Sequence, residues 1–196
     1  MLSLKDGEKL VMLARKSIRS QFYNEDVKIS DITKKKFSEK QGVFVTLNMH
    51  GELRGCIGYP EPVLPLYEAI VEAAKSAAFH DPRFASLTKE EFESITIEIS
   101  VLTKPEQIKV LKADDYLKYV KIGEDGLIAQ AGFHNRGLLL PQVFTEYEAD
   151  PEMALSMTCQ KAGLSSDAWR NLDVKVFKFQ AQIFAEEDGK VVEKKI

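Results

Sequence analysis

The chain contains the same order of predicted elements twice: strand, turn, strand and helix. The first copy begins at Gly42 and the second at Gly126, and a shift of 84 positions also places His50 on His134. Hairpins followed by helices favour an α+β fold with antiparallel strands over a doubly wound parallel sheet. Few residues are identical between the copies, so chance similarity is the alternative explanation.

These two copies define the expected organisation of the chain. We expect approximate repeats over residues 42–102 and 126–184, joined by a charged region over 103–125 where a subdomain boundary fits best. A last strand over about 174–183 precedes a charged tail. At this length and composition, one large domain or two small ones are possible, and we expect a single domain spanning 1–196.

Composition and charge exclude several classes of protein. No apolar stretch approaches the roughly 20 residues of a membrane-spanning helix, and Lys5 and Asp6 interrupt any signal-peptide core before an amphipathic helix expected over 6–22. A net charge of -3 argues against a broad nucleic-acid surface, and two cysteines are too few for a disulfide framework. We therefore expect a cytoplasmic protein that binds neither membrane nor nucleic acid.

The densest potential chemistry lies in residues 53–58, with the sequence LRGCIG. Arg54 and Cys56 are two apart on an expected strand, so their side chains project from the same face. A neighbouring guanidinium lowers the pKa of a thiol, and glycines at Gly55 and Gly58 allow a ligand to approach closely. The alternative is that Cys56 belongs to the core, because free cysteine is among the most often buried residue types.

The register of the first hairpin decides the surroundings of Cys56. A two-residue turn would pair Cys56 with Val45 and Arg54 with Leu47, which places a charge on an aliphatic face. We favour a three-residue turn over residues 49–51 because it separates the faces. It groups Val43, Val45 and Leu47 with Leu53, Gly55 and Ile57, and it leaves Arg54 and Cys56 with Phe44, Thr46 and Asn48.

Other polar residues extend this candidate site. His80 is a candidate general base that Asp81 would orient, and the alternative is a turn in which Asp81 accepts hydrogen bonds from backbone amides. Arg83 is a candidate for binding an anionic substrate or for holding the turn to Glu98. Gln142 follows a proline that interrupts an expected strand, so its amide is a candidate for the site.

Metal and phosphate sites are not indicated. The three histidines, His50, His80 and His134, lack close ligand spacing, and no glycine-rich phosphate loop is present. The second cysteine, Cys159, lies on the apolar stripe of an expected helix and is predicted to be structural.

Four segments in order resemble the AMMECR family. The first is residues 53–58 (LRGCIG), and the second combines residues 78–79 (AF) and 81–84 (DPRF). The third is residues 137–143 (GLLLPQV), and the fourth combines residues 161–164 (KAGL) and Trp169. The resemblance implies two β-and-α repeats around a barrel-like antiparallel sheet, with a cleft between a larger and a smaller subdomain near the hexapeptide. Two positions depart from the family pattern: Glu124-Asp125, where a basic residue and histidine are expected, and Ala149, where tryptophan is frequent.

The resemblance supplies neither a reaction nor a cofactor. It implies a functional link to dioxygenase-like and radical S-adenosylmethionine proteins. The leading hypothesis is an enzyme or accessory protein that binds or modifies a small anionic or carbonyl-containing ligand, with Cys56 as nucleophile and His80 as base. Its ligand-binding residues would be Arg54, Gly55, Gly58, Asp81, Arg83 and Gln142. The alternative is a non-catalytic binding or regulatory module in which the hexapeptide is structural.

Overall fold

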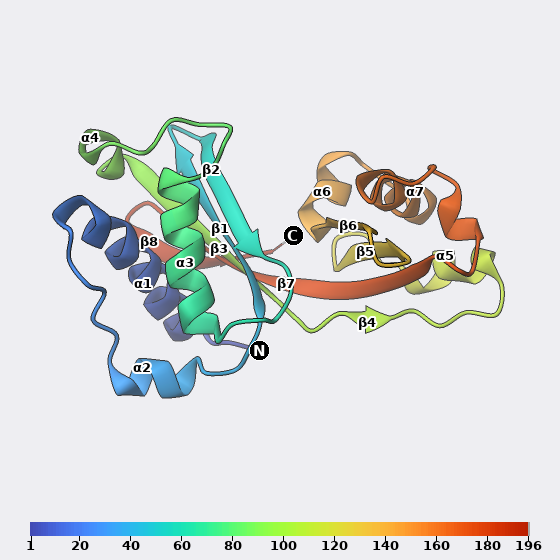
Figure 1. The fold of residues 1–196 in the computed structure, drawn as a ribbon, viewed down its shortest axis with the longest axis horizontal. Helices are drawn as coiled ribbons and strands as arrows, with labels where there is room; N and C mark the ends of the chain where they lie inside the picture. Colours follow the sequence, from blue (N-terminus) through green and yellow to red (C-terminus); the bar gives the residue numbers. More distant parts are fainter. Residues whose placement is uncertain (196) are drawn as a thin grey trace. The chain divides into compact units, whose positions relative to one another are not determined.

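The computed structural model describes residues 1–195, which form two compact units (Figure 1). The first unit comprises Met1–Leu102 and Gln182–Lys195, and the second comprises Thr103–Ala181. One long strand, β7 (Lys175–Glu187), contributes its first part to the second unit and its last part to the first. No helix within the described residues is long and apolar enough to cross a membrane.

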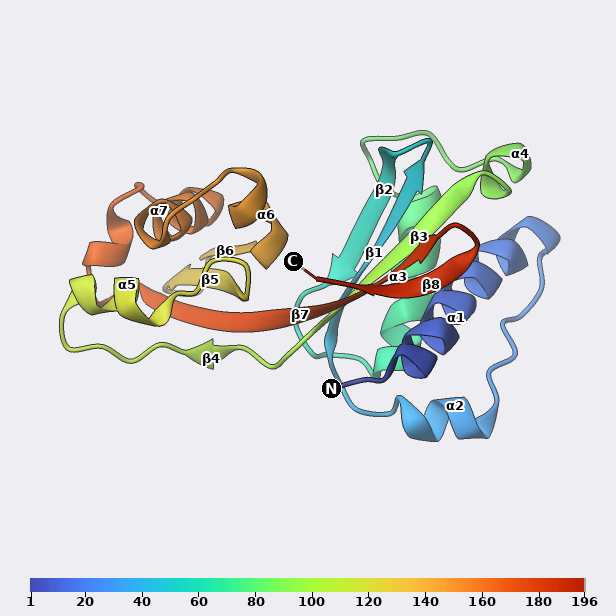
Figure 2. The same ribbon diagram turned by 180° about the vertical axis from the view of Figure 1, so that it is seen from behind.

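The first unit is an antiparallel sheet with two long helices on one face (Figures 1 and 2). Its strand order is β2-β1-β3-β7, with β8 paired to β7. The elements are α1 (Leu4–Tyr23), α2 (Asp31–Lys36), β1 (Gly42–Met49), β2 (Glu52–Tyr59), α3 (Leu66–Phe79), α4 (Lys89–Phe92), β3 (Ile95–Leu102) and β8 (Lys190–Lys194). The tail expected to follow the last strand therefore forms a further strand, because β7 gives it a partner.

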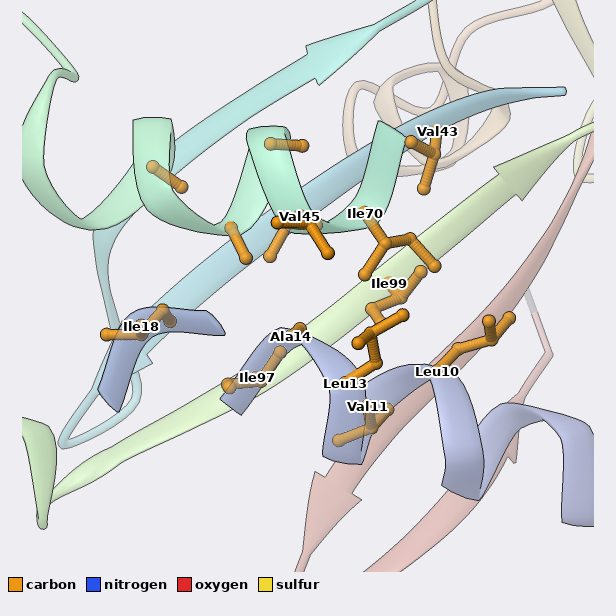
Figure 3. Close-up of a cluster of buried hydrophobic side chains, with 14 of the residues drawn as sticks. Leu10, Val11, Leu13, Ala14, Ile18, Val43, Val45, Ile70, Ile97 and Ile99 are labelled. Atoms are coloured by element: carbon orange, nitrogen blue, oxygen red, sulfur yellow. The ribbon is translucent and has the colours of Figure 1, made fainter. Parts of the chain in front are cut away.

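Alternation along the strands builds the core of this unit. Every second residue of β1 and β3 points towards α1 and α3, where the aliphatic side chains interlock (Figure 3). The β1 and β3 residues in this layer are fully buried, at 0% exposed: Val43, Val45, Leu47, Ile97 and Ile99. Burial of each such side chain contributes about 1.5–3 kcal/mol. The opposite face of β1, β2 and β3 carries no helix of this unit (Figure 2).

The first hairpin differs from the predicted register. Its turn has two residues, His50 and Gly51, with positive φ angles of 54° and 85°, as in the mirror-image turns that suit a hairpin. The three-residue turn is therefore wrong. A shift in register between Leu47 and Asn48 leaves Arg54 without a partner on β1, as in a β-bulge, so Cys56 lies opposite Thr46. The bulge places Cys56 and Ile57 on the faces that were predicted for them, but the predicted grouping of Leu53 with the aliphatic residues is wrong, because Leu53 lies opposite Asn48 and is exposed.

The second unit also contains a hairpin followed by helices and a strand, as the first does. That strand, β7, is antiparallel to the first strand of the hairpin. The elements are β4 (Glu106–Gln107), the 3-10 turn η1 (Ala113–Asp115), α5 (Tyr116–Tyr119), β5 (Asp125–Ala131), β6 (Asn135–Leu139), α6 (Pro141–Glu146), α7 (Pro151–Lys161) and the 3-10 turn η2 (Ala168–Arg170). Helix α7 packs on β5 and β6 around Trp169 and Phe144. The α+β class with antiparallel strands is confirmed.

In both units a glycine allows the second hairpin strand to contact the end of a helix. A Cβ atom at Gly55 would lie 2.2 Å from the carbonyl oxygen of Ala77 in α3. A Cβ atom at Gly137 would lie 2.3 Å from the backbone nitrogen of Ala162, which follows α7. Since both obstacles are backbone atoms, only glycine fits at these two positions.

Candidate functional site

The backbone of Cys56 is held by a buried carboxylate. Asp81 follows the C-cap of α3, and its side chain is only 1% exposed. Its Oδ2 accepts a hydrogen bond from the Cys56 N–H at 2.8 Å, and its Oδ1 accepts one from the Arg83 N–H at 3.1 Å. The predicted alternative, a turn in which Asp81 accepts hydrogen bonds from backbone amides, matches the bond from Arg83, whereas the bond from Cys56 on β2 was not predicted.

Arg83 completes the arrangement around Cys56. Its Nε and Nη2 donate to the two oxygens of Asp81 at 2.9 and 2.7 Å, and Nη2 also donates to the Cys56 carbonyl oxygen at 3.2 Å. Both backbone groups of Cys56 are therefore bound by the Asp81–Arg83 pair. Since β2 is the end strand of the sheet order, this pair occupies the edge where a further strand would otherwise pair.

Electrostatics favour the charged form of Asp81. The hydrogen bonds from the Arg83 side chain hold the pKa of the Asp81 carboxyl far below its usual range, and burial opposes them. Hydrogen bonds from the Cys56 and Arg83 backbone amides lower the pKa further. Asp81 is thus an ionised structural anchor rather than a group that exchanges protons near neutral pH.

Arg54 is bound to Glu91. Its Nε and Nη2 each donate to one carboxylate oxygen of Glu91 at 3.0 Å, and the two side chains are 12% and 26% exposed. Its guanidinium also lies 5.9 Å from the centre of the Phe84 ring. The ion pair lowers the pKa of Glu91, which also closes the capping box of α4 with Thr88. The planar guanidinium is therefore bound by a carboxylate that was not among the predicted site residues.

The thiol of Cys56 is partly exposed and neutral. Thr46 Oγ1 donates to its Sγ at 3.3 Å. Burial raises the pKa of the Cys56 thiol; the hydrogen bond from Thr46 and the charge of Arg83 lower it less, while Asp81 and Glu98 add to the rise. The predicted lowering of this pKa by Arg54 is wrong, because Arg54 is paired with Glu91.

His80 is exposed at the C-cap of α3, where its backbone N–H donates to the Ser76 carbonyl oxygen at 2.8 Å. Within residues 1–195, no hydrogen bond joins its side chain to Cys56 or Asp81. The predicted orientation of His80 by Asp81 is therefore absent, since both Asp81 oxygens are used by Cys56 and Arg83. Among residues 1–195, no ion pair joins Arg83 to Glu98 as the alternative predicted: Arg83 binds Asp81 and the Cys56 carbonyl oxygen, and Lys194 binds Glu98 at 3.0 Å.

The face of the sheet without helices carries the Cys56 side chain. We call this surface the polar face, and define it by Phe44, Thr46, Cys56, Gly58 and Glu98. A Cβ atom at Gly58 would lie 2.5 Å from the Phe44 ring, so the glycine leaves room for this ring against the strand. The polar face therefore combines an aromatic ring, a hydroxyl and a neutral thiol on one rigid support.

Gln142 lies in the second unit, in the first turn of α6 and not on a strand. Strand β6 ends at Leu139, because Pro141 suits the first turn of a helix. The Oε1 atom of Gln142 is shielded from solvent, and no donor within the described residues contacts it. This oxygen is thus able to accept a hydrogen bond from a ligand or a water molecule.

The two departures from the family pattern have structural roles. The buried Asp125 carboxylate accepts hydrogen bonds from the Lys121 N–H at 3.1 Å and from the Lys178 Nζ at 3.2 Å. Ala149 is buried in the core of the second unit. Cys159 is also buried there, at 0% exposed, as predicted. Within the described residues, no group of three His, Cys, Asp or Glu side chains has the spacing of a metal site.

Comparison with known proteins identifies the family. The family model named AMMECR1 matches residues 11–184. Protein MJ0810 of Methanocaldococcus jannaschii is 48% identical over 200 residues, covering 100% of this chain and 98% of that protein. A protein of Methanothermobacter thermautotrophicus is 48% identical over 189 residues, covering 96% and 97%. The crystal structure of the uncharacterized protein PH0010 from Pyrococcus horikoshii matches with a TM-score of 0.89 at 42% identity, covering 98% of each chain. The chain belongs to the AMMECR1 family.

Proposed function

We propose that this protein is a non-catalytic binding module whose ligand lies on the polar face of the first unit. The observation that carries the proposal is the two-point ion pair between Arg54 and Glu91. It occupies the guanidinium that a reactive thiolate at Cys56 would need, and burial keeps the thiol protonated near neutral pH. The hexapeptide then acts as a support for the binding face.

The chemistry of the polar face favours an uncharged ligand with an aromatic or carbonyl group. Two of its hydrogen-bonding groups, the Thr46 hydroxyl and the Cys56 thiol, are neutral, and the third, the Glu98 carboxylate, is in an ion pair. Lys194, the cation beside this face, is paired with Glu98 and Glu187. The Phe44 ring supplies a surface on which a flat group can stack. Such a module suits an accessory role beside a modification enzyme, which is the class of partner that the family resemblance implies.

Thiol alkylation tests the neutral state of Cys56. In a Cys159→Ala variant, which leaves one cysteine, we expect the rate of reaction with iodoacetamide to rise with pH and to titrate above the range of an ordinary cysteine thiol, since burial raises the pKa of Cys56. The rate constant is measured across pH under native conditions, with mass spectrometry locating the adduct. The proposal would be contradicted if the alkylation rate of Cys56 titrated below about pH 8 and an Arg54→Gln variant lost this titration. Such a result would show a reactive thiolate that Arg54 stabilises.

Binding to the polar face is tested with two matched probes, benzamide and benzoate. We expect benzamide to shift the amide resonances of Thr46 and Cys56 in two-dimensional NMR spectra, and benzoate to shift them less because the nearby cations Arg83 and Lys194 are already paired with carboxylates. A Phe44→Ala variant should lose the response, whereas Cys56→Ser should keep it. Stronger shifts with benzoate would instead favour an anionic ligand.

A further inference from the structure

The outer edge of β2 is closed by side chains instead of by a strand. In an antiparallel sheet the N–H and C=O of one residue point to the same side. Because the Cys56 N–H binds Asp81 and the Cys56 C=O binds Arg83, both groups point away from β1. The residues two positions away on a strand present their backbone groups to the same edge, which for β2 includes Gly58.

We propose that the Asp81–Arg83 pair is a latch that keeps the edge of β2 closed to strand addition by a second copy of this chain. The pair supplies one acceptor and one donor, which are the two hydrogen-bonding partners that a neighbouring strand would offer to Cys56. Its carboxylate is buried, and its guanidinium is half exposed. The latch therefore satisfies the backbone and places a charged group over the edge, both of which oppose strand pairing.

A second copy fits this edge because β2 can pair with itself. An antiparallel pair centred on Cys56 is symmetric, since each Cys56 would then exchange both hydrogen bonds with the Cys56 of the other copy. In that register Arg54 lies opposite Gly58 of the other copy, so no like charges meet. In this register residues 53–59 of the two copies pair, a length within the usual range for strands.

The test compares the wild type with Asp81→Ala, which removes the latch, and with Arg83→Ala, which frees only the Cys56 carbonyl. We expect Asp81→Ala to self-associate as its concentration rises in sedimentation velocity, and Arg83→Ala to do so more weakly. A matched control, Glu124→Ala, removes a surface ion pair with Lys121 and should behave as the wild type.

Hydrogen exchange of the Cys56 amide identifies the edge that is used. In dilute Asp81→Ala, we expect exchange to be about tenfold or more faster than in the wild type, and to slow again as the variant associates. A folded Asp81→Ala protein that stays monomeric, or one whose Cys56 amide stays exposed in the associated state, would overturn the proposal. If Asp81→Ala fails to fold, sedimentation velocity of Arg83→Ala decides, because that variant frees the Cys56 carbonyl, and a monomer there counts against the latch.

Discussion

A Gly55→Ala variant is expected to lose about 3 kcal/mol or more of its free energy of unfolding, the upper end of the range for overpacking. The added Cβ would lie 2.2 Å from the carbonyl oxygen of Ala77 and 3.1 Å from its carbonyl carbon. Both are backbone atoms of α3, so the clash is relieved only by moving the helix away from β2. That movement would also shift Asp81, which follows the end of α3, from the Cys56 amide.

Urea unfolding of the variant and of two further glycine variants measures this effect. Gly51→Ala is the control in the same hairpin: no atom lies within 4 Å of the added Cβ, but φ is +85°, so we expect a cost of about 1 kcal/mol from backbone strain. Gly137→Ala, whose Cβ would meet Ala162, should cost as much as Gly55→Ala. An unchanged unfolding midpoint for Gly55→Ala would show that the helix end moves freely.

Local patterns in the sequence predicted most of the fold. The period of the apolar residues gave a first helix over 6–22, and α1 spans Leu4–Tyr23. The alternation after Gly126 gave a second hairpin, which the structure contains as β5 and β6. These elements were predictable because their signals depend on residues that are close in the sequence. Strand β8 was missed, because its pairing depends on β7 and not on an apolar pattern of its own.

The candidate site was less predictable, because it depends on contacts between distant segments. The pattern placed Arg54 and Cys56 on one face, but a β-bulge at Arg54 directs its guanidinium to Glu91, 37 residues later. The only signal for Glu91 was its capping box with Thr88, which indicates a helix start and not an ion pair. Asp81 was identified as a polar residue near the site, yet its partner depends on where α3 ends relative to β2.

An Asp81→Ala variant is expected to lose about 1.5–3 kcal/mol of its free energy of unfolding at neutral pH, the range for hydrogen bonds to a charged group, because Arg83 is half exposed and solvent can take over its charge. The substitution leaves the Cys56 N–H and the Arg83 guanidinium without their acceptor. Because the exposed pair between Lys118 and Asp115 lies on the surface, an Asp115→Ala control should cost only about 0–1 kcal/mol.

The pH dependence of this difference distinguishes an ionised anchor from a packing effect. The folded state lowers the pKa of Asp81, so its contribution is fully present above the pKa of about 3.9 that an unfolded aspartate has. We therefore expect the gap in stability between wild type and Asp81→Ala to be constant from pH 7 down to about 4, and to shrink as the pH falls further towards the folded pKa. Urea unfolding of both proteins at each pH measures the gap. A gap that persists at the lowest pH at which both proteins fold would mean that the shape of the side chain, and not its charge, holds Cys56 in place.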